Sequence, residues 1–393
     1  MRVLVVGAGI AGPTLAYWLQ RFGHEVALVE RAPRLREGGY VVDFWGAGFD
    51  VADRMGIVPR LMAEGYHFCE AREVSRSGRR LSHFDPRHVV GLSGGRYVTI
   101  GRSDLSRAIY EAADGKVEAI FGDTVTSLDD AGDRVRVEFE HAATREFELV
   151  IGADGLHSRV RRLAFGPEHE FERPLGIAVA AFDVPGYRPR DELVAVMHTE
   201  VGHQVLRLAL RDDVTMFCVM FRYDGEMPED DMVAQQEIVR RCLRGVGWEV
   251  PAILERMPEA RTFYMDRASQ IRMPSWSRGR VALIGDAGAA PSLLAGQGSA
   301  LAMIEAYVLA YELREAHGDH RVAFARYERR LARLVRGKQD GATGMASAFV
   351  PRNRPLLLLR NVVFGLMTIP PIAKMAVGRS LIDPVRLPPV PVG

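Results

Sequence analysis

The chain has 393 residues, of which 48% are hydrophobic and 26% charged, and its 51 Lys and Arg residues nearly balance its 50 Asp and Glu residues. This length predicts two or three structural units, and the balanced charge argues against a role in binding nucleic acid. Cys69, Cys218 and Cys242 form no CxxC pair, and no apolar run reaches the roughly 18 residues of a membrane span, so we expect a cytoplasmic protein without a disulfide framework or a metal site.

The first thirty residues predict a βαβ unit. Residues 3–6 are apolar and mostly β-branched, which is typical of a strand buried on both faces of a parallel sheet. Apolar residues recur at helical spacing over residues 10–22, and residues 25–29 predict a second strand that ends at Glu30. An acid about 20 residues beyond the glycine turn can accept hydrogen bonds from an adenosine ribose.

The turn between the first strand and the helix has the spacing Gly7-x-Gly9-x-x-Gly12. Gly7 permits the tight turn, Gly9 lets the backbone approach a pyrophosphate, and Gly12 lets the helix lie close to the strand. The helix N-terminus offers free N–H groups and a positive dipole end to the phosphates. We therefore predict a dinucleotide site, although this unit alone fits NAD and FAD equally well.

Further along, mixed short elements precede a block of longer strands. Residues 73–100 suggest hairpins, Ser103 is a candidate cap for a helix that reaches about residue 113, and residues 116–151 alternate as strands do. The longer strands are predicted at residues 177–184, 193–198, 204–210 and 215–222, with a helix near 233–243. This block predicts an antiparallel sheet that could roof a ligand chamber.

The last part of the chain predicts one more buried strand and several helices. Residues 281–284 form the strand, and helices are expected at about 299–316 and 321–344. An apolar stretch follows at residues 356–366, which we expect to be a helix packed on the body, with a membrane-contacting patch and a dimer surface as alternatives.

Three separated segments point to one cofactor. Arg102 immediately precedes a helix, where it can reach back to a phosphate or a flavin. Asp154 lies in Gly152-Ala153-Asp154-Gly155, directly after a buried strand. Asp286 ends another buried strand, and Gly296-Gln297-Gly298 begins the helix that follows it.

Together with the glycine turn, these segments resemble the class A FAD-dependent monooxygenases of the p-hydroxybenzoate hydroxylase-like family, which includes tetracycline-inactivating and antibiotic-tailoring hydroxylases. The resemblance covers residues 1–345 and rests on the order of the motifs. It implies an α/β fold with a Rossmann-like FAD-binding domain of the glutathione reductase type, interleaved with an antiparallel β-sheet substrate domain. The domains are expected at 1–72, 97–169 and 270–345 for FAD, 73–96 and 170–269 for substrate, and 346–393 for a C-terminal helical tail.

The resemblance also implies roles for single residues. Glu30 would hold the adenosine ribose, Arg102 would contact FAD, and Asp154 would lie in a segment associated with FAD and nicotinamide. Asp286 would bond the ribityl chain, and the helix start at 296–298 would face the flavin's pyrimidine edge, where a positive dipole end stabilises the reduced, anionic flavin. The predicted cofactor-binding residues are Gly7, Gly9, Ala11, Gly12, Glu30, Arg31, Asp43, Arg102, Asp154, Asp286, Gly296 and Gly298.

The implied reaction is an NADPH- or NADH-dependent hydroxylation of an aromatic or polyketide-like molecule by O2 through a flavin C4a-hydroperoxide. The cofactor would carry the chemistry, so we expect no protein nucleophile and assign no catalytic residue. Residues 287–295 lack the histidine and the proline pair that relatives carry, so the pocket on the flavin face is expected to differ. The alternatives are a reductase or desaturase of the geranylgeranyl reductase type on the same scaffold and a non-catalytic FAD-binding protein. His203, Phe217, Met220 and Tyr223 are candidate pocket-lining residues, and we expect a monomer or a homodimer.

Overall fold

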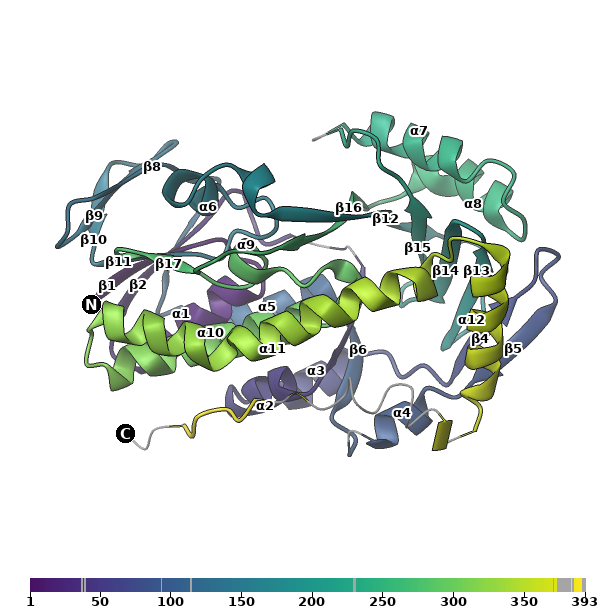
Figure 1. The fold of residues 1–393 in the computed structure, drawn as a ribbon, viewed down its shortest axis with the longest axis horizontal. Coiled ribbons are helices and arrows are strands. Elements are labelled where there is room, and N and C mark those ends of the chain that lie inside the picture. Colours follow the sequence, from purple (N-terminus) through teal and green to yellow (C-terminus); the bar gives the residue numbers. More distant parts are fainter. Residues whose placement is uncertain are drawn as a thin grey trace.

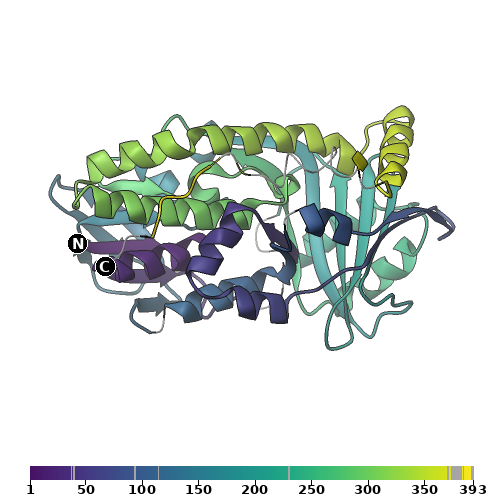
Figure 2. The same ribbon diagram turned by 90° about the horizontal axis from the view of Figure 1, so that it is seen from below.

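The computed structural model describes residues 1–36, 38, 40–92, 94–113, 115–228, 231–369, 371–372, 383 and 385–390. The molecule is elongated, with one large sheet near each end (Figure 1). A long helix, α11 (His320–Phe349), runs along one side from the first sheet to the second, as Figure 2 also shows. The predicted α/β fold class is confirmed.

The first sheet contains the N-terminal βαβ unit. Its strand order is β17 (Ser277–Arg278), β18 (Val281–Leu283), β11 (Leu149–Gly152), β1 (Arg2–Val6), β2 (Glu25–Glu30) and β7 (Glu118–Phe121). The strands from β18 to β7 are parallel to one another, and only β17 pairs antiparallel. The short apolar run predicted as a buried strand is therefore central, with neighbours on both sides.

Both faces of this sheet are covered, which explains why β1 has no polar alternation. Val3 and Val5 pack against the helices of one face, whereas Leu4 and Val6 pack under a small sheet on the other. The helices are α1 (Ala11–Arg21), α5 (Arg102–Ala112), α10 (Gly298–Glu315) and α11. The small sheet has the order β10 (Arg145–Phe147), β9 (Val135–Phe139) and β8 (Val125–Asp130).

The second sheet has seven strands. Their order is β16 (Phe263–Ile271), β12 (Glu172–Pro185), β15 (Val214–Arg222), β14 (His203–Ala209), β13 (Val194–Glu200), β4 (Glu70–Val74) and β5 (Arg80–Phe84). All neighbours are antiparallel except β13 and β4. Helices α7 (Met232–Cys242) and α8 (Val250–Arg256) pack on one face, so only the other face is left to form a chamber.

Short elements connect the two sheets. They are β3 (Val41–Trp45), which pairs with β6 (Tyr97–Gly101), and the helices α2 (Ala47–Arg54), α3 (Val58–Glu64), α4 (Arg87–Leu92), α6 (Arg159–Ala164) and α9 (Asp286–Ala289). Three short 3-10 turns occur at Glu168–Glu170, Met257–Glu259 and Leu293–Ala295.

Several elements differ from those expected from the sequence. Helix α5 begins at Arg102 with Gly101 as its N-cap, so Ser103 lies inside the helix and does not cap it. Part of the predicted hairpin region forms helix α4. No helix was predicted at the position of α8. Strand β4 begins at Glu70, so the second sheet includes residues that precede the expected hairpin.

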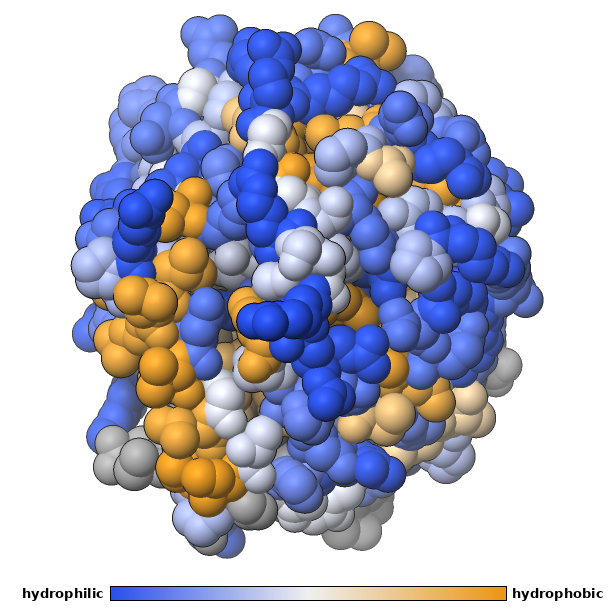
Figure 3. Space-filling view, turned by 90° about the vertical axis from the view of Figure 1, so that its right-hand side faces the viewer, coloured by the Kyte–Doolittle hydropathy of each residue, from blue (hydrophilic) through white to orange (hydrophobic). Residues whose placement is uncertain are grey.

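The apolar stretch near residue 360 forms helix α12 (Arg354–Leu366), but it does not pack as a core helix, because none of its residues is buried. Figure 3 faces the end of the molecule that carries α12, β4 and β5, and apolar side chains gather there in a band. The large exposed apolar side chains of α12 are Leu358, Leu359, Val362, Val363 and Leu366.

Much of the predicted tail after α12 lies outside the described residues, but a short C-terminal segment is placed. Asp383 accepts a hydrogen bond from the Ala47 backbone N–H (2.8 Å) and pairs with Lys338 (2.5 Å). Tyr307 donates to the Pro388 carbonyl (3.0 Å). This segment therefore ties α2 to α10 and α11. No helix among the described residues is long and apolar enough to cross a membrane.

Candidate active site

A cavity of about 1000 Å³ lies between the glycine turn and the second sheet. Both sheets contribute to its lining, so distant parts of the chain meet there. Seven of the predicted cofactor-binding residues line it: Gly9, Ala11, Asp43, Arg102, Asp286, Gly296 and Gly298. The other five, Gly7, Gly12, Glu30, Arg31 and Asp154, lie behind or beside the lining.

Gly7 and Gly12 shape the turn through close packing. Gly7 has a φ of +106°, and a Cβ there would lie 2.5 Å from the Ala153 carbonyl oxygen. A Cβ on Gly12 would lie 1.9 Å from the Gly7 carbonyl oxygen. Gly9 is different, because its Cβ would meet only Arg102, at 3.9 Å from Nη2. Gly9 is thus the glycine that opens onto the cavity.

Glu30 holds the glycine turn from behind. Its carboxylate accepts hydrogen bonds from the backbone N–H groups of Ala8 (2.7 Å) and Ala32 (2.9 Å). The Gly7 N–H donates to the Val29 carbonyl (2.7 Å) in the same region. Glu30 therefore has a structural task at the end of β2 besides any contact to a ribose, whereas its neighbour Arg31 is exposed.

Arg102 and Asp286 bring opposite charges to the cavity from α5 and α9. A Cβ on Gly298 would lie 3.8 Å from Asp286 Oδ1, so this carboxylate adjoins the first turn of α10. Burial raises the pKa of Asp286, and the nearby Arg102 guanidinium opposes that rise. Since Gly9 adjoins Arg102, the glycine turn, the arginine and the acid form one continuous polar region.

Two helices that face this region begin without side-chain caps. Neither α1 nor α10 has a capping side chain or an acid in its first turn. By contrast, α6 and α11 are capped by Ser158 and Asp319. The first N–H groups of α1 and α10 are therefore available to an anionic ligand, and both helix dipoles favour one.

A buried acid that the sequence did not single out supports the Asp286 turn. Glu305 on α10 is fully buried, and its carboxyl accepts a hydrogen bond from the Gly285 N–H. Burial raises the pKa of Glu305 well above its usual range, and the hydrogen bond from the Gly285 N–H opposes that rise. A single acid in the otherwise apolar stretch 300–310 was the signal that could have identified it.

Asp154 is placed differently from the other predicted acids. Its carboxylate accepts hydrogen bonds from Ser158 Oγ (2.5 Å) and from the backbone N–H groups of Arg159 (2.7 Å) and Val160 (3.1 Å). It thus organises the start of α6, while its neighbours Ala153 and Gly155 line the cavity. The segment 152–155 therefore reaches the cavity through Ala153 and Gly155 and not through the Asp154 carboxylate.

Asp43 lines the cavity from β3. It accepts a hydrogen bond from Thr99 Oγ1 (2.6 Å) across the β3–β6 pair. Burial and the nearby Asp43 raise the pKa of Tyr97 well above its usual range, so that phenol stays protonated.

Two tyrosines that the sequence did not reveal face the polar region. The rings of Tyr40 and Tyr264 are 5.4 Å apart between centroids, and both residues line the cavity. Burial raises the pKa of each, so both phenols are hydrogen-bond donors at neutral pH. Tyr264 belongs to β16, so the second sheet supplies a phenol where it approaches the first sheet.

The remainder of the second sheet forms an apolar wall. The lining side chains from β12 to β15 are Val179, Ala181, Ala195, Met197, Gln204, Leu206, Leu208, Met216, Cys218 and Met220. Of the candidates named from the sequence, only Met220 is among them. Phe217 lies on the opposite face and packs under α7 and α8, because neighbouring residues of a strand point to opposite faces. His203 and Tyr223 do not line the cavity.

Two further segments complete the enclosure. The stretch that departs from the family pattern contributes Ser292, Leu293 and Leu294 to the lining. The far end is covered by α12 and the end of α11, whose lining residues include Phe349, Leu356, Leu359 and Val363. Arg360 of α12 pairs with the fully buried Glu73 of β4 (2.8 Å), which fastens α12 to the sheet.

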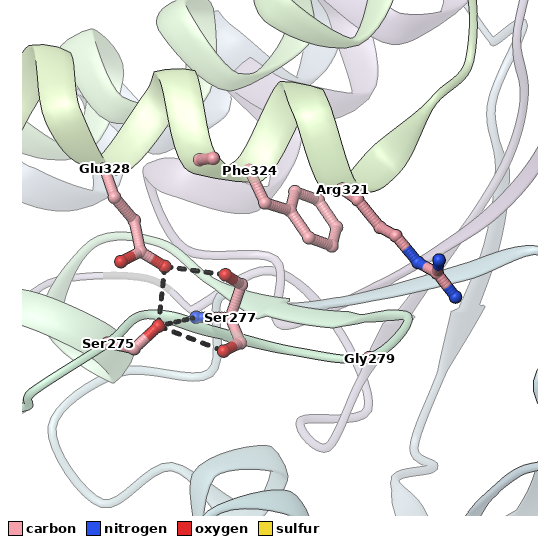
Figure 4. A pocket seen from close by; sticks show the side chains of 7 residues that line it. Ser275, Ser277, Gly279, Arg321, Phe324 and Glu328 are labelled. Carbon is pink, nitrogen blue, oxygen red and sulfur yellow. Dashed lines mark hydrogen bonds between the residues drawn. The ribbon is translucent and has the colours of Figure 1, made fainter.

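A second pocket, of about 330 Å³, lies beside β17 and α11. Figure 4 shows Glu328 directed at Ser275 and Ser277. Glu328 accepts hydrogen bonds from Ser275 Oγ (2.8 Å), Ser277 Oγ (2.6 Å) and the Trp276 N–H (3.0 Å). Because its one acid already accepts three bonds, this pocket joins a hairpin to α11 and offers little to a ligand.

Comparison with known proteins adds a family match. The model of the family described as FAD binding domain matches residues 1–332. An uncharacterised protein of Mycobacterium tuberculosis strain H37Rv is 40% identical over 340 residues, which are 86% of this chain and 91% of the relative. A flavin-dependent monooxygenase of Legionella longbeachae is 32% identical over 356 residues, 90% of each chain.

Solved structures agree with these relatives. Tetracycline destructase Tet(51) matches with a TM-score of 0.85 and 31% identity over 99% of both chains. Klebsiella pneumoniae HpxO complexed with FAD and uric acid matches with a TM-score of 0.80 over 98% of this chain and 97% of that one. The identity to HpxO is 23%, so this likeness concerns the fold alone.

Proposed function

The chain belongs to the FAD binding domain family and is a flavin-dependent monooxygenase, and on that premise we propose that it uses NADPH or NADH and O2 to hydroxylate an aromatic or polycyclic small molecule. In the balanced reaction, one oxygen atom enters a C–H bond of the substrate and the other leaves as water. The reduced nicotinamide supplies two electrons and a proton, and a second proton comes from solvent.

One observation carries this proposal. The cavity of about 1000 Å³ is continuous from the polar region around Gly9, Arg102 and Asp286 to the apolar wall of the second sheet. A cavity of this size lies at the upper end of the range of about 300–1000 Å³ that is usual for ligand pockets. It therefore has room for the reactive end of a cofactor and for a substrate beside it.

The polar region fits FAD. Gly9 leaves space next to Arg102, and the uncapped start of α1 offers N–H groups, so a pyrophosphate would be held by Arg102 and the backbone at residues 9–11. Asp286 would accept hydrogen bonds from the ribityl hydroxyls, and Glu30 would do so from the ribose. The start of α10 at Gly298 would face the pyrimidine edge of the flavin, with Gly296 beside it.

When bound, FAD supplies the redox chemistry, accepting electrons from the nicotinamide and passing them to oxygen. The protein's own part is to orient the substrate and to exclude water. The apolar wall and α12 keep the substrate end dry, which favours oxygen transfer over wasteful release of peroxide. The neutral phenols of Tyr40 and Tyr264 are available as donors at the border between the two ends.

Two measurements test this function. Purified protein should be yellow with the absorption spectrum of bound FAD, and colourless protein that cannot be reconstituted with FAD would refute the site. With ¹⁸O2 and NADPH or NADH, a hydroxylated product should carry the label. A panel of phenols and ring compounds serves as substrates, with tetracycline included because the structure of a tetracycline destructase is similar.

The outcome also separates the alternatives. Substrate reduction without incorporation of ¹⁸O would favour a reductase of the same fold. Failure to oxidise NADPH or NADH with every compound, together with neither labelled product nor peroxide, would leave FAD binding as the sole activity.

A further inference from the structure

The cavity face of the second sheet presents its side chains in rows, because neighbouring antiparallel strands are in register. One row crosses the sheet through a run of apolar residues and one thiol: Met197, Leu206, Cys218 and Ala181. Burial raises the pKa of the Cys218 thiol to about 12, so it adds no charge. The next row contains Gln204 opposite Thr199 on one side and Met220 on the other.

The charged side chains around this wall are already paired. Arg360 pairs with the buried Glu73 (2.8 Å). Arg87 binds both carboxylate oxygens of Asp85, with contacts between 2.6 and 2.9 Å. Arg102 lies at the polar end beside Asp286, where it would bind the proposed cofactor. Among the described lining residues of the sheet, none offers a cation to a carboxylate, and an unpaired buried anion is strongly disfavoured.

Gln204 is the single amide on the wall. It is 3% exposed, and its Nε2 donates to Thr199 Oγ1 (3.1 Å). A glutamine amide has two N–H donors and a carbonyl oxygen that accepts, and this bond uses one of the donors. The strand alternation that directs Leu206 and Leu208 into the cavity directs Gln204 there as well. A ligand group can therefore satisfy the remainder of the amide.

Five methionines belong to the apolar part of the lining. Met197, Met216 and Met220 come from the sheet, Met345 comes from α11, and Met367 comes from the end of α12. Thioethers are adaptable and make favourable contacts with the edges of aromatic rings. Such a surface suits flat ring systems of somewhat variable shape.

Resting on the proposed function, we propose that the substrate is an uncharged, largely apolar ring compound, and that Gln204 selects it by a hydrogen bond to one neutral hydroxyl or carbonyl group. Carboxylate-bearing ring compounds are rejected because the wall has no free cation for them. Gln204 is a specificity-determining residue under this proposal, and it takes no part in oxygen transfer.

A matched pair of compounds tests the charge preference. Methyl 6-hydroxy-2-naphthoate and 6-hydroxy-2-naphthoate share their rings and hydroxyl group and differ in the carboxylate. Titration calorimetry with the FAD-loaded protein measures their binding without requiring turnover. We expect the ester to bind at least tenfold more tightly than the acid. Equal or tighter binding of the acid, or no binding of either compound, would overturn the proposal.

Variants test the part played by Gln204. Gln204→Leu should weaken binding of the ester by about threefold to tenfold, the range of one hydrogen bond. Gln204→Met keeps the side-chain length and should weaken binding of the ester by a similar factor. Agreement between the two variants would show that the loss does not come from a folding defect in one of them. Methyl 2-naphthoate lacks the hydroxyl group. If Gln204 binds that group, both variants should bind methyl 2-naphthoate as tightly as the native protein does.

Gln235→Leu makes the same exchange on α7, which packs on the face of the sheet away from the cavity, so it is the control and should leave the affinity for the ester within about twofold. An equal loss in Gln235→Leu and Gln204→Leu would contradict a hydrogen bond to Gln204. The binding experiment is independent of catalysis. If the protein prefers the ester but incorporates no ¹⁸O, only the proposed reaction is refuted. Incorporation with equal binding of acid and ester refutes only the proposed selectivity.

Discussion

The two walls of the cavity are built on opposite principles. At the polar end, backbone atoms approach one another closely, and Arg102 and Asp286 supply charge beside the uncapped starts of α1 and α10. At the other end, the second sheet presents apolar side chains with a single amide, Gln204. Ligand binding at the first wall depends on the position of the backbone. Ligand binding at the second wall depends on which side chains occupy the regularly spaced positions of the sheet.

This difference determines how each wall responds to substitution. A backbone that lies within van der Waals contact of another backbone cannot move aside, so a single added methyl group is costly there. Side chains on a sheet face can exchange for others of similar volume at low cost, as long as no charge is left unpaired. The following predictions test this contrast, beginning with the largest expected effect.

Gly12→Ala should be the most damaging change at the polar wall. The new Cβ would lie 1.9 Å from the Gly7 carbonyl oxygen, so α1 would have to move away from β1. We expect a loss of about 3 kcal/mol or more in the free energy of unfolding, together with loss of bound FAD. Chemical denaturation and the flavin content of the purified protein measure the two effects.

Gly337→Ala is the matched control for that change. Gly337 lies within α11 with no atom within 4 Å of a built Cβ. Alanine should therefore stabilise the helix, by about 0.5–1 kcal/mol. Similar losses for both alanine variants would show that the close approach at Gly12 is not the cause.

At the apolar wall, the largest effect should come from its one buried ion pair. Arg360→Met leaves Glu73 buried without its partner, and we expect a loss of about 3 kcal/mol in unfolding free energy. Adding Glu73→Gln to this variant removes the stranded charge and should restore most of the stability. A double variant as unstable as Arg360→Met would contradict the assignment of the loss to Glu73.

Asp286→Asn should affect the cofactor more than the fold. We expect FAD to bind at least tenfold more weakly, about 1.4 kcal/mol, because a ribityl hydroxyl loses a charged acceptor. Equilibrium dialysis of the apoprotein measures the affinity. Asp340→Asn, which alters an exposed acid paired with Arg272, should leave that affinity unchanged. Unchanged FAD binding in Asp286→Asn would refute its proposed role.

The smallest effect concerns the junction of the two walls. His157, beside the start of α6, contacts Glu168 (2.9 Å) and Asp266 of β16 (3.1 Å), and these carboxylates raise its pKa from 6.5 to about 10. Its stabilising contribution is therefore complete below pH 6.5 and is lost as the pH rises through about 10. The side chain is half exposed, so each ion pair contributes no more than about 1 kcal/mol.

His157→Gln should accordingly be less stable than the native protein at pH 6, and the gap should close by about pH 10. Thermal denaturation of both proteins across this range provides the measurement. A gap that stays constant with pH would mean that the histidine acts through packing and not through its charge.

The fold was largely predictable from the sequence, and the reason is local. Strand β1, helix α1 and strand β2 follow from an apolar run, helical periodicity and glycines whose spacing has a steric purpose, as Gly7 and Gly12 demonstrate. The strands from β12 to β15 were expected within a few residues of their bounds because their turns and alternation are clear. Helix α8 was missed because it has only seven residues and a proline near its start.

The candidate site was predictable only in part. Arg102 and Asp286 were found because they follow or end recognisable elements, and both line the cavity. Tyr40 and Tyr264 were not found, since nothing in their local sequence indicates that folding brings them together. Glu305 was overlooked, although it is the one acid in the apolar stretch 300–310. Asp154 had a convincing local pattern, yet its carboxylate is occupied by the N-terminus of α6.

The sequence alone determined the dinucleotide turn, because the spacing of its glycines acts over a few residues. It also determined the family of the chain, because the order of the motifs can be read directly along the sequence. Only the tertiary structure decided which side of each strand in the second sheet faces the cavity. That choice depends on which face α7 and α8 cover, and it placed Gln204, Cys218 and Met220 in the chamber while sending Phe217 to the other side.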